Sequence, residues 1–67
     1  MRSSQEIANV IRELLKERKT NVSIMLEACS LQKDTIGNMD RGSMISADKL
    51  GKIALYLGVS ADYLLGI

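Results

Sequence analysis

The segment Asn21–Gly42, NVSIMLEACSLQKDTIGNMDRG, contains two short apolar patterns of helical spacing that follow each other directly. In its first half, apolar residues recur at i, i+3, i+4 and i+7, one stripe of a 3.6-residue helix: Val22, Met25, Leu26 and Cys29. After a short break, Ile36 and Met39 repeat this spacing. We therefore predict two short amphipathic helices joined by a turn.

The residues between these apolar positions are polar or small and fall on the opposite face: Gln32, Lys33, Asp34, Gly37, Asn38 and Arg41. Amide and cationic side chains on a helix that a partner helix holds at the surface can hydrogen-bond to base edges in a major groove. The pattern therefore indicates a helix-turn-helix over about residues 21–42.

The rest of the chain extends this pattern from about Ile7 to Gly66. An opening helix ends in IRELLKERK, DRG follows the two-helix unit, and SADKLGKIALYLGV precedes the closing SADYLLG. In these segments the chain resembles the Cro/CI-type (XRE-like, phage-repressor) helix-turn-helix family. LGVSADYLLG is the most specific piece, since it is typical of such repressors from Gram-positive bacteria and their phages. The resemblance implies an all-α, five-helix, lambda-repressor-like DNA-binding domain, and we expect one domain over residues 1–67.

Residues that favour helix ends place the helices. Ser3 with Glu6 forms a capping box before a helix predicted from about Ser4 to Lys19. Preferred N-cap residues open three further helices: Asn21, Ser46 and Ser60. Gly58 is the expected terminator of the fourth helix.

Helical periodicity also predicts the core. We expect one cluster that includes Ile7, Leu14, Met25, Leu26, Ile36, Leu50, Ile53 and Leu57, closed by Tyr63, Leu64 and Leu65. Cys29 lies on the apolar stripe, so we interpret it as a small core residue and not as a redox sensor.

Composition agrees with a small helical domain and excludes several classes. The chain has 67 residues, 46% of them hydrophobic, with no proline and only two aromatic residues. With one cysteine and no histidine, the usual zinc-ligand sets are missing, and we expect no metal, cofactor or small-molecule ligand. No apolar stretch of ~18 residues and no signal-like start occur, so we expect a cytoplasmic protein that does not contact a membrane.

Charge gives weak support for nucleic-acid binding. Nine Lys and Arg against eight Asp and Glu leave a net charge of +1. On the predicted DNA-facing surface, Asp34 and Asp40 oppose Lys33 and Arg41. We therefore expect modest nonspecific affinity for DNA and binding that depends on dimerisation.

The resemblance assigns base contacts to the second helix of the unit, at Gln32, Lys33, Asp34, Gly37 and Asn38. Lys33 can donate to guanine, Gln32 and Asn38 can pair with adenine, and Asp34 can accept from cytosine. Gly37 has no side chain and would permit close approach of the helix. For the others the alternative is a solvated helix face.

Phosphate contacts are expected on both sides of the unit. Backbone N–H groups of Asn21, Val22 and Ser23 open the first helix, and Arg41 and Ser43 follow the second. Such contacts set the register of the protein on DNA and carry no sequence information. Ordinary capping is the alternative role for Asn21.

The chain departs from the family pattern at several positions. Val22 replaces a Gln that often binds phosphate, and Leu26 replaces a small residue where the two helices cross. Ser30 replaces the turn glycine, so it must adopt a left-handed conformation or end the helix differently. Leu15 replaces an Arg that often pairs with the acidic residue at position 40, which leaves Asp40 to find another partner or water.

Three classes of function remain. The first is a sequence-specific transcriptional regulator, a phage or mobile-element type repressor that binds an inverted-repeat operator as a homodimer. The dimer contact is expected at the last helix with Tyr56, Tyr63 and Ile67, although the two tyrosines fit the edge of the core equally well. The second is a helix-turn-helix module for protein interaction, antitoxin-like or anti-repressor. The third, an enzyme, has the least support, because no histidine, activated nucleophile or glycine-rich phosphate loop occurs. The sequence fits a complete regulator and the N-terminal domain of a longer repressor equally.

Overall fold

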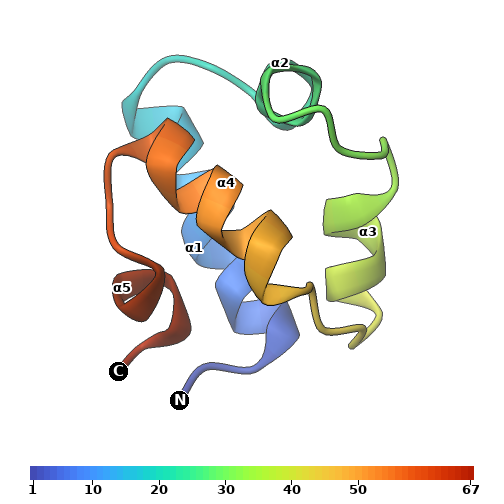
Figure 1. The fold of residues 1–67 in the computed structure, drawn as a ribbon, viewed down its shortest axis with the longest axis vertical. Coiled ribbons are helices and arrows are strands. Elements are labelled where there is room, and N and C mark those ends of the chain that lie inside the picture. The colour runs from blue at the N-terminus through green and yellow to red at the C-terminus, as the bar shows by residue number, and fades with distance from the viewer.

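The computed structural model describes residues 1–67 as five α-helices without strands, which confirms the predicted all-α class. Their bounds are α1 Ser4–Glu17, α2 Val22–Ala28, α3 Thr35–Asp40, α4 Ala47–Leu57 and α5 Ala61–Leu65. Figure 1 shows α4 crossing in front of α1, α3 on the opposite side from α5, and the two chain ends close together beside α5. None of the helices combines the length and apolar character needed to cross a bilayer.

Side chains cap the helices where the sequence predicts. In the capping box, the Glu6 N–H donates to Ser3 Oγ at 3.2 Å and the Ser3 N–H donates to Glu6 Oε1 at 2.9 Å. The other predicted caps also accept a backbone N–H through their side chains: Asn21, Ser46 and Ser60. Gly58 ends α4 with φ of 73°, the left-handed conformation that glycine adopts without strain.

The end of α1 is a correction. The helix ends at Glu17, whereas we expected Lys19. The Arg18 N–H still donates to the carbonyls of Leu14 and Leu15, both at 3.1 Å, but Lys19 has φ of 55° and cannot continue a right-handed helix. Lys16 is therefore the only basic residue in the last turn of α1.

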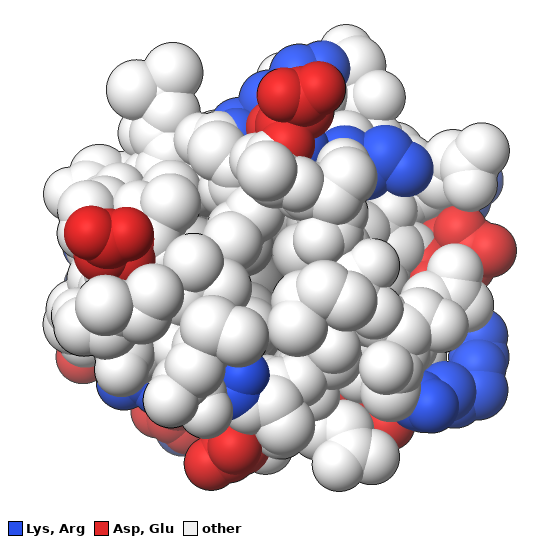
Figure 2. Space-filling model, turned by 60° about the horizontal axis from the view of Figure 1, so that its bottom comes forward, with Lys and Arg blue, Asp and Glu red and all other residues white.

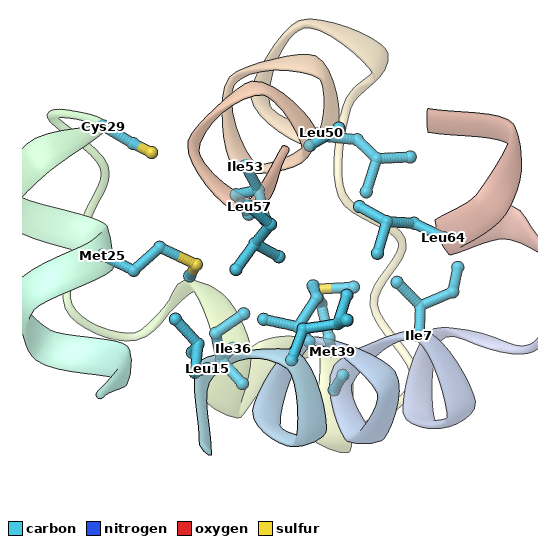
Figure 3. Packing of buried hydrophobic residues seen from close by; sticks show 14 of the residues in the cluster. Ile7, Leu15, Met25, Cys29, Ile36, Met39, Leu50, Ile53, Leu57 and Leu64 are labelled. Atoms are coloured by element: carbon cyan, nitrogen blue, oxygen red, sulfur yellow. The ribbon is translucent and has the colours of Figure 1, made fainter. Parts of the chain in front are cut away.

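The predicted core is confirmed. All eight residues that periodicity assigned to it belong to one cluster of 15 buried hydrophobic residues. Figure 3 shows the buried side chains of α1, α3 and α5 meeting those of α2 and α4. Cys29 points from α2 toward α4, with its thiol 3.6 Å from the carbonyl of Lys52, and burial raises the pKa of that thiol. It is a core residue, as the apolar stripe predicts.

The closing helix α5 is less buried than expected. Leu64 is fully buried and Leu65 is half-buried, but Tyr63 is 49% exposed, so its assignment to the core is wrong. Its ring lies under the Arg2 guanidinium, 5.6 Å from the ring centroid. The Arg2 N–H also donates to the carbonyl of Leu65 at 2.7 Å. The N-terminal segment thus binds the end of α5, and Tyr63 stays at the surface.

Candidate nucleic-acid interface

The two short helices α2 and α3 rest on different parts of the core. α2 packs against α4, whereas α3 packs against α1. The buried side chains of α3 are Thr35, Ile36 and Met39, and its other residues remain at least partly accessible. In Figure 1, α2 is seen end-on while α3 runs along the picture plane, so the two helices cross steeply. This arrangement leaves one side of α3 free of the core.

A left-handed residue starts the connection between α2 and α3. Ser30 has φ of 57°, so it adopts the conformation usually taken by glycine, which costs roughly 1 to 2 kcal/mol for a residue with a Cβ. Immediately after it, the Leu31 N–H donates to the carbonyl of Leu26 at 2.8 Å. The serine that replaces the expected glycine therefore preserves a sharp turn at the cost of local strain.

The start of α3 is a second correction. We expected Gln32, Lys33 and Asp34 on the second helix of the unit, but α3 begins at Thr35, so Gln32 and Lys33 precede the helix and Asp34 is its N-cap. The half of the turn closest to α3 is fixed by Thr35, whose hydroxyl donates to the carbonyl of Gln32 at 2.7 Å. Asp34 makes no side-chain cap hydrogen bond. Gln32 and Lys33, which are predicted to contact bases, therefore lie in the turn before α3 and not on the helix itself.

Two surface hollows gather most of the predicted DNA contacts. The first, of about 250 Å³, lies between α3 and the start of α4, and its polar lining includes Gln32, Asp34, Asn38, Ser43 and Lys49. The second, of about 520 Å³, lies beside α2 and includes Val22, Ser23 and Lys33. Lys49 was absent from the predicted contacts. The only feature of the sequence that could have indicated a DNA contact at Lys49 is its position outside the apolar stripe of α4.

Gly37 lies at a half-buried position on α3 and lines neither hollow. A Cβ built there would meet no heavy atom within 4 Å, so the fold itself does not require glycine at this position. The missing side chain instead leaves open space over α3. That Gly37 permits close approach to DNA stays a prediction.

At the end of α3, a residue predicted to contact a base, Asn38, is hydrogen-bonded to a residue predicted to contact phosphate, Arg41. Arg41 Nη2 donates to Asn38 Oδ1 at 2.7 Å. The carbonyl of Asn38 accepts the N–H groups of Arg41, at 3.1 Å, and Ser43, at 3.0 Å. The Ser43 N–H is thus already used within the domain, and its hydroxyl remains for a ligand.

Asp40 has a partner that sequence analysis missed. Arg12 of α1 forms a double contact with Asp40, with Nη1 2.8 Å from Oδ1. Gln5 Nε2 also donates to the carbonyl of Asp40 at 2.9 Å. The hydrogen bond from Arg12 and its charge hold the pKa of Asp40 below its usual value. The pair therefore ties the end of α3 to α1 and balances one of the two acidic charges near α3.

At the start of α2, the Asn21 side chain is occupied as a cap. Its Oδ1 accepts the Ile24 N–H at 2.9 Å. Val22 is half-buried and Ser23 is exposed, and N–H groups in the first turn of a helix have no partner further back in the helix. The backbone N–H groups of Asn21, Val22 and Ser23, with the Ser23 hydroxyl, therefore remain available for a phosphate.

Comparisons of the chain with protein-family models, with curated proteins and with solved structures give no significant match. The residues around α3 therefore carry the functional inference. No group of three or more His, Cys, Asp and Glu side chains is placed to hold a metal ion.

Proposed function

We propose that the protein is a sequence-specific DNA-binding transcriptional regulator of the Cro/CI-type family, with α2 and α3 as the helix-turn-helix of a lambda-repressor-like domain. The observation that supports this most is the hollow beside α3, in which Gln32, Asp34, Asn38, Ser43 and Lys49 lie together with apolar side chains. The side of the same helix that carries Ile36 is buried, and α3 packs against α1. The protein would repress by occupying an operator that overlaps a promoter.

In this proposal, α3 and the turn before it enter the major groove. Lys33 donates to guanine O6 and N7, Gln32 pairs with adenine N6 and N7, and Asp34 accepts from cytosine N4. Because Gln32 and Lys33 precede α3, the N-terminal end of the helix points at the bases, as in other helix-turn-helix proteins.

Phosphate contacts on both sides of α3 set the register. The N–H groups of Val22 and Ser23 face one backbone strand, and Arg41 with the Ser43 hydroxyl faces the other. The Arg12–Asp40 pair supports this arrangement because it removes an unbalanced negative charge next to Arg41. Lys49, in the hollow beside α3, adds a cation.

Function also requires two copies of the domain. The longest extent of the molecule is 26 Å, shorter than the ~34 Å that separates half-sites one helical turn apart. We place the homodimer contact on the end of the molecule that carries both chain ends and α5. On the face turned forward in Figure 2, charged side chains lie mainly along the edge. Exposed apolar residues at this end include Met1, Tyr63 and Ile67.

The test is selection of binding sites from random duplexes, followed by affinity measurements over a range of salt concentrations. We expect an approximate inverted repeat, and affinity that falls steeply as salt rises. A single half-site should bind only in the weak range of ~10⁻⁴ to 10⁻⁶ M. Equal affinity for one half-site and the full repeat would contradict the dimer, and the absence of salt-dependent duplex binding would contradict the function.

A second candidate is a helix-turn-helix module for protein interaction, antitoxin-like or anti-repressor. The observation that favours it is exposed apolar surface away from α3, where Leu55 is 84% and Ile24 is 51% exposed. The net charge of +1 also suits a protein partner. Neither candidate involves catalysis, a cofactor or a small-molecule ligand, and both place the protein in the cytoplasm.

A further inference from the structure

The contact between Asn38 and Arg41 bears on which base the protein selects, and this inference rests on the proposed function. A guanidinium has only hydrogen-bond donors, so the Asn38 atom that faces Arg41 Nη2 at 2.7 Å must be the acceptor oxygen. The orientation of the Asn38 amide is therefore set by its partner. Oδ1 faces Arg41, and Nδ2 is the free end of the amide.

The backbone around this pair is also fixed. The Asn38 carbonyl accepts two N–H groups, from Arg41 and from Ser43. These two hydrogen bonds hold the backbone that follows α3 close to Asn38. Asn38 is half-buried and lines the hollow beside α3. The orientation of the amide is thus present in the protein before any ligand binds.

An oriented amide changes the expected base. Adenine recognition requires Oδ1 to accept from N6 while Nδ2 donates to N7. In this structure Oδ1 is already engaged in a charge-assisted hydrogen bond, which is stronger than a neutral one and polarises the amide so that Nδ2 becomes a better donor. Guanine presents two acceptors, N7 and O6, on its major-groove edge. Because Arg41 occupies one of the two lone pairs of Oδ1, the amide presents mainly its Nδ2 donors, and these fit guanine better than adenine.

We propose that Asn38 recognises guanine as a donor, in place of the adenine pairing that an unrestrained asparagine prefers, and that Arg41 is the positioning residue that imposes this choice. Arg41 would then influence sequence preference although it contacts phosphate and no base. The affected base position is the one that Asn38 contacts.

The experiment measures the affinity of the domain for its selected site and for every single-base variant of that site. The wild-type protein should prefer guanine over adenine at one position by roughly 5- to 150-fold. Arg41→Ala should reverse or abolish this preference, since it frees Oδ1, and should also weaken binding to all sequences. Asn38→Asp keeps an acceptor for Arg41 but has no amide donor, so it should lose the guanine preference while Arg41 stays in place.

Two controls separate a specific effect from a general one. In an Asn38→Ala background, Arg41→Ala should leave the base preferences unchanged, because the residue it positions is gone. Lys33→Ala should alter a different base position and leave the guanine preference intact. Unfolding midpoints close to that of the wild type would show that the variants are folded.

The outcomes distinguish this inference from the proposed function. If Arg41→Ala lowers affinity equally for all variants of the site and keeps the same base at every position, Arg41 is only a phosphate contact and the inference is wrong, while DNA binding stands. If the wild-type domain shows no salt-dependent affinity for duplex DNA, both the function and the inference are wrong.

Discussion

The two helices of the α2–α3 unit are similar in length, with 7 and 6 residues, but different interactions hold them in place. α2 begins at a local signal, the Asn21 side chain that accepts the Ile24 N–H at 2.9 Å. α3 has no side-chain cap hydrogen bond at Asp34. Its far end is fixed instead by α1, through the contacts of Gln5 and Arg12 with Asp40.

This difference shows that the proposed recognition helix is positioned largely from outside its own sequence. Substitutions on α1 can therefore shift α3 without changing any side chain that is proposed to face DNA. The buried faces of both helices nevertheless join one core, since Met25 and Met39 belong to the same cluster. The polar contacts therefore adjust the position of α3, and the apolar ones provide its stability.

The largest expected effect tests whether the two helices share that core. Met25→Ala and Met39→Ala should each lower the free energy of unfolding by ~2 to 5 kcal/mol, since both side chains are almost fully buried. Chemical denaturation measures this, and Leu55→Ala, at an exposed position, is a control that should change stability by less than ~0.5 kcal/mol. A loss at Met39 as small as that at Leu55 would show that α3 is not part of the core.

A smaller effect tests the local signal at each helix start. Asn21→Ala should destabilise the protein by ~0.5 to 2 kcal/mol, because it removes a side-chain cap. Asp34→Ala removes no cap hydrogen bond and should cost less. Denaturation midpoints of the two variants give the comparison directly. A larger loss of stability in Asp34→Ala than in Asn21→Ala would contradict the conclusion that only α2 is held by a side-chain cap.

The smallest effect concerns pH and the contact that fixes α3. Arg12 lowers the pKa of Asp40 below its ordinary value of 3.8, so the stabilisation is fully present above that value and is lost as pH falls through the lower, folded-state pKa. Because the pair is about 40% exposed, the contribution is small and sensitive to salt.

The measurement is unfolding by denaturant between about pH 6 and about pH 2. Asp40→Asn should be less stable than the wild type near neutral pH and should lose less stability on acidification. In an Arg12→Met background the same substitution should have little effect on either property. An unchanged acid dependence in Asp40→Asn would mean that the ion pair does not form in solution.

Local signals explain what the sequence could predict. The caps at Asn21, Ser46 and Ser60 and the end of α4 at Gly58 depend on residues within one helical turn, so their positions follow from the sequence alone. The core also follows, because periodicity is a property of each helix.

Contacts between distant residues explain the rest. The start of α3 was placed too early because the hydroxyl of Thr35 binds the Gln32 carbonyl, a choice of turn that the apolar pattern does not reveal. The partner of Asp40 was missed because Arg12 lies 28 residues away. Lys49 was missed because its position beside α3 depends on how the loop between α3 and α4 folds.

The most direct test of the account is to map the DNA-binding face by NMR, titrating the labelled domain with its selected duplex and following each backbone amide. We expect the changes to centre on the proposed contacts, which are Asn21, Val22, Ser23, Gln32, Lys33, Asp34, Gly37, Asn38, Arg41 and Ser43. Changes confined to the surface around Ile24, Leu55 and Tyr56, with α3 unaffected, would contradict the claim that α3 and the turn before it contact the bases.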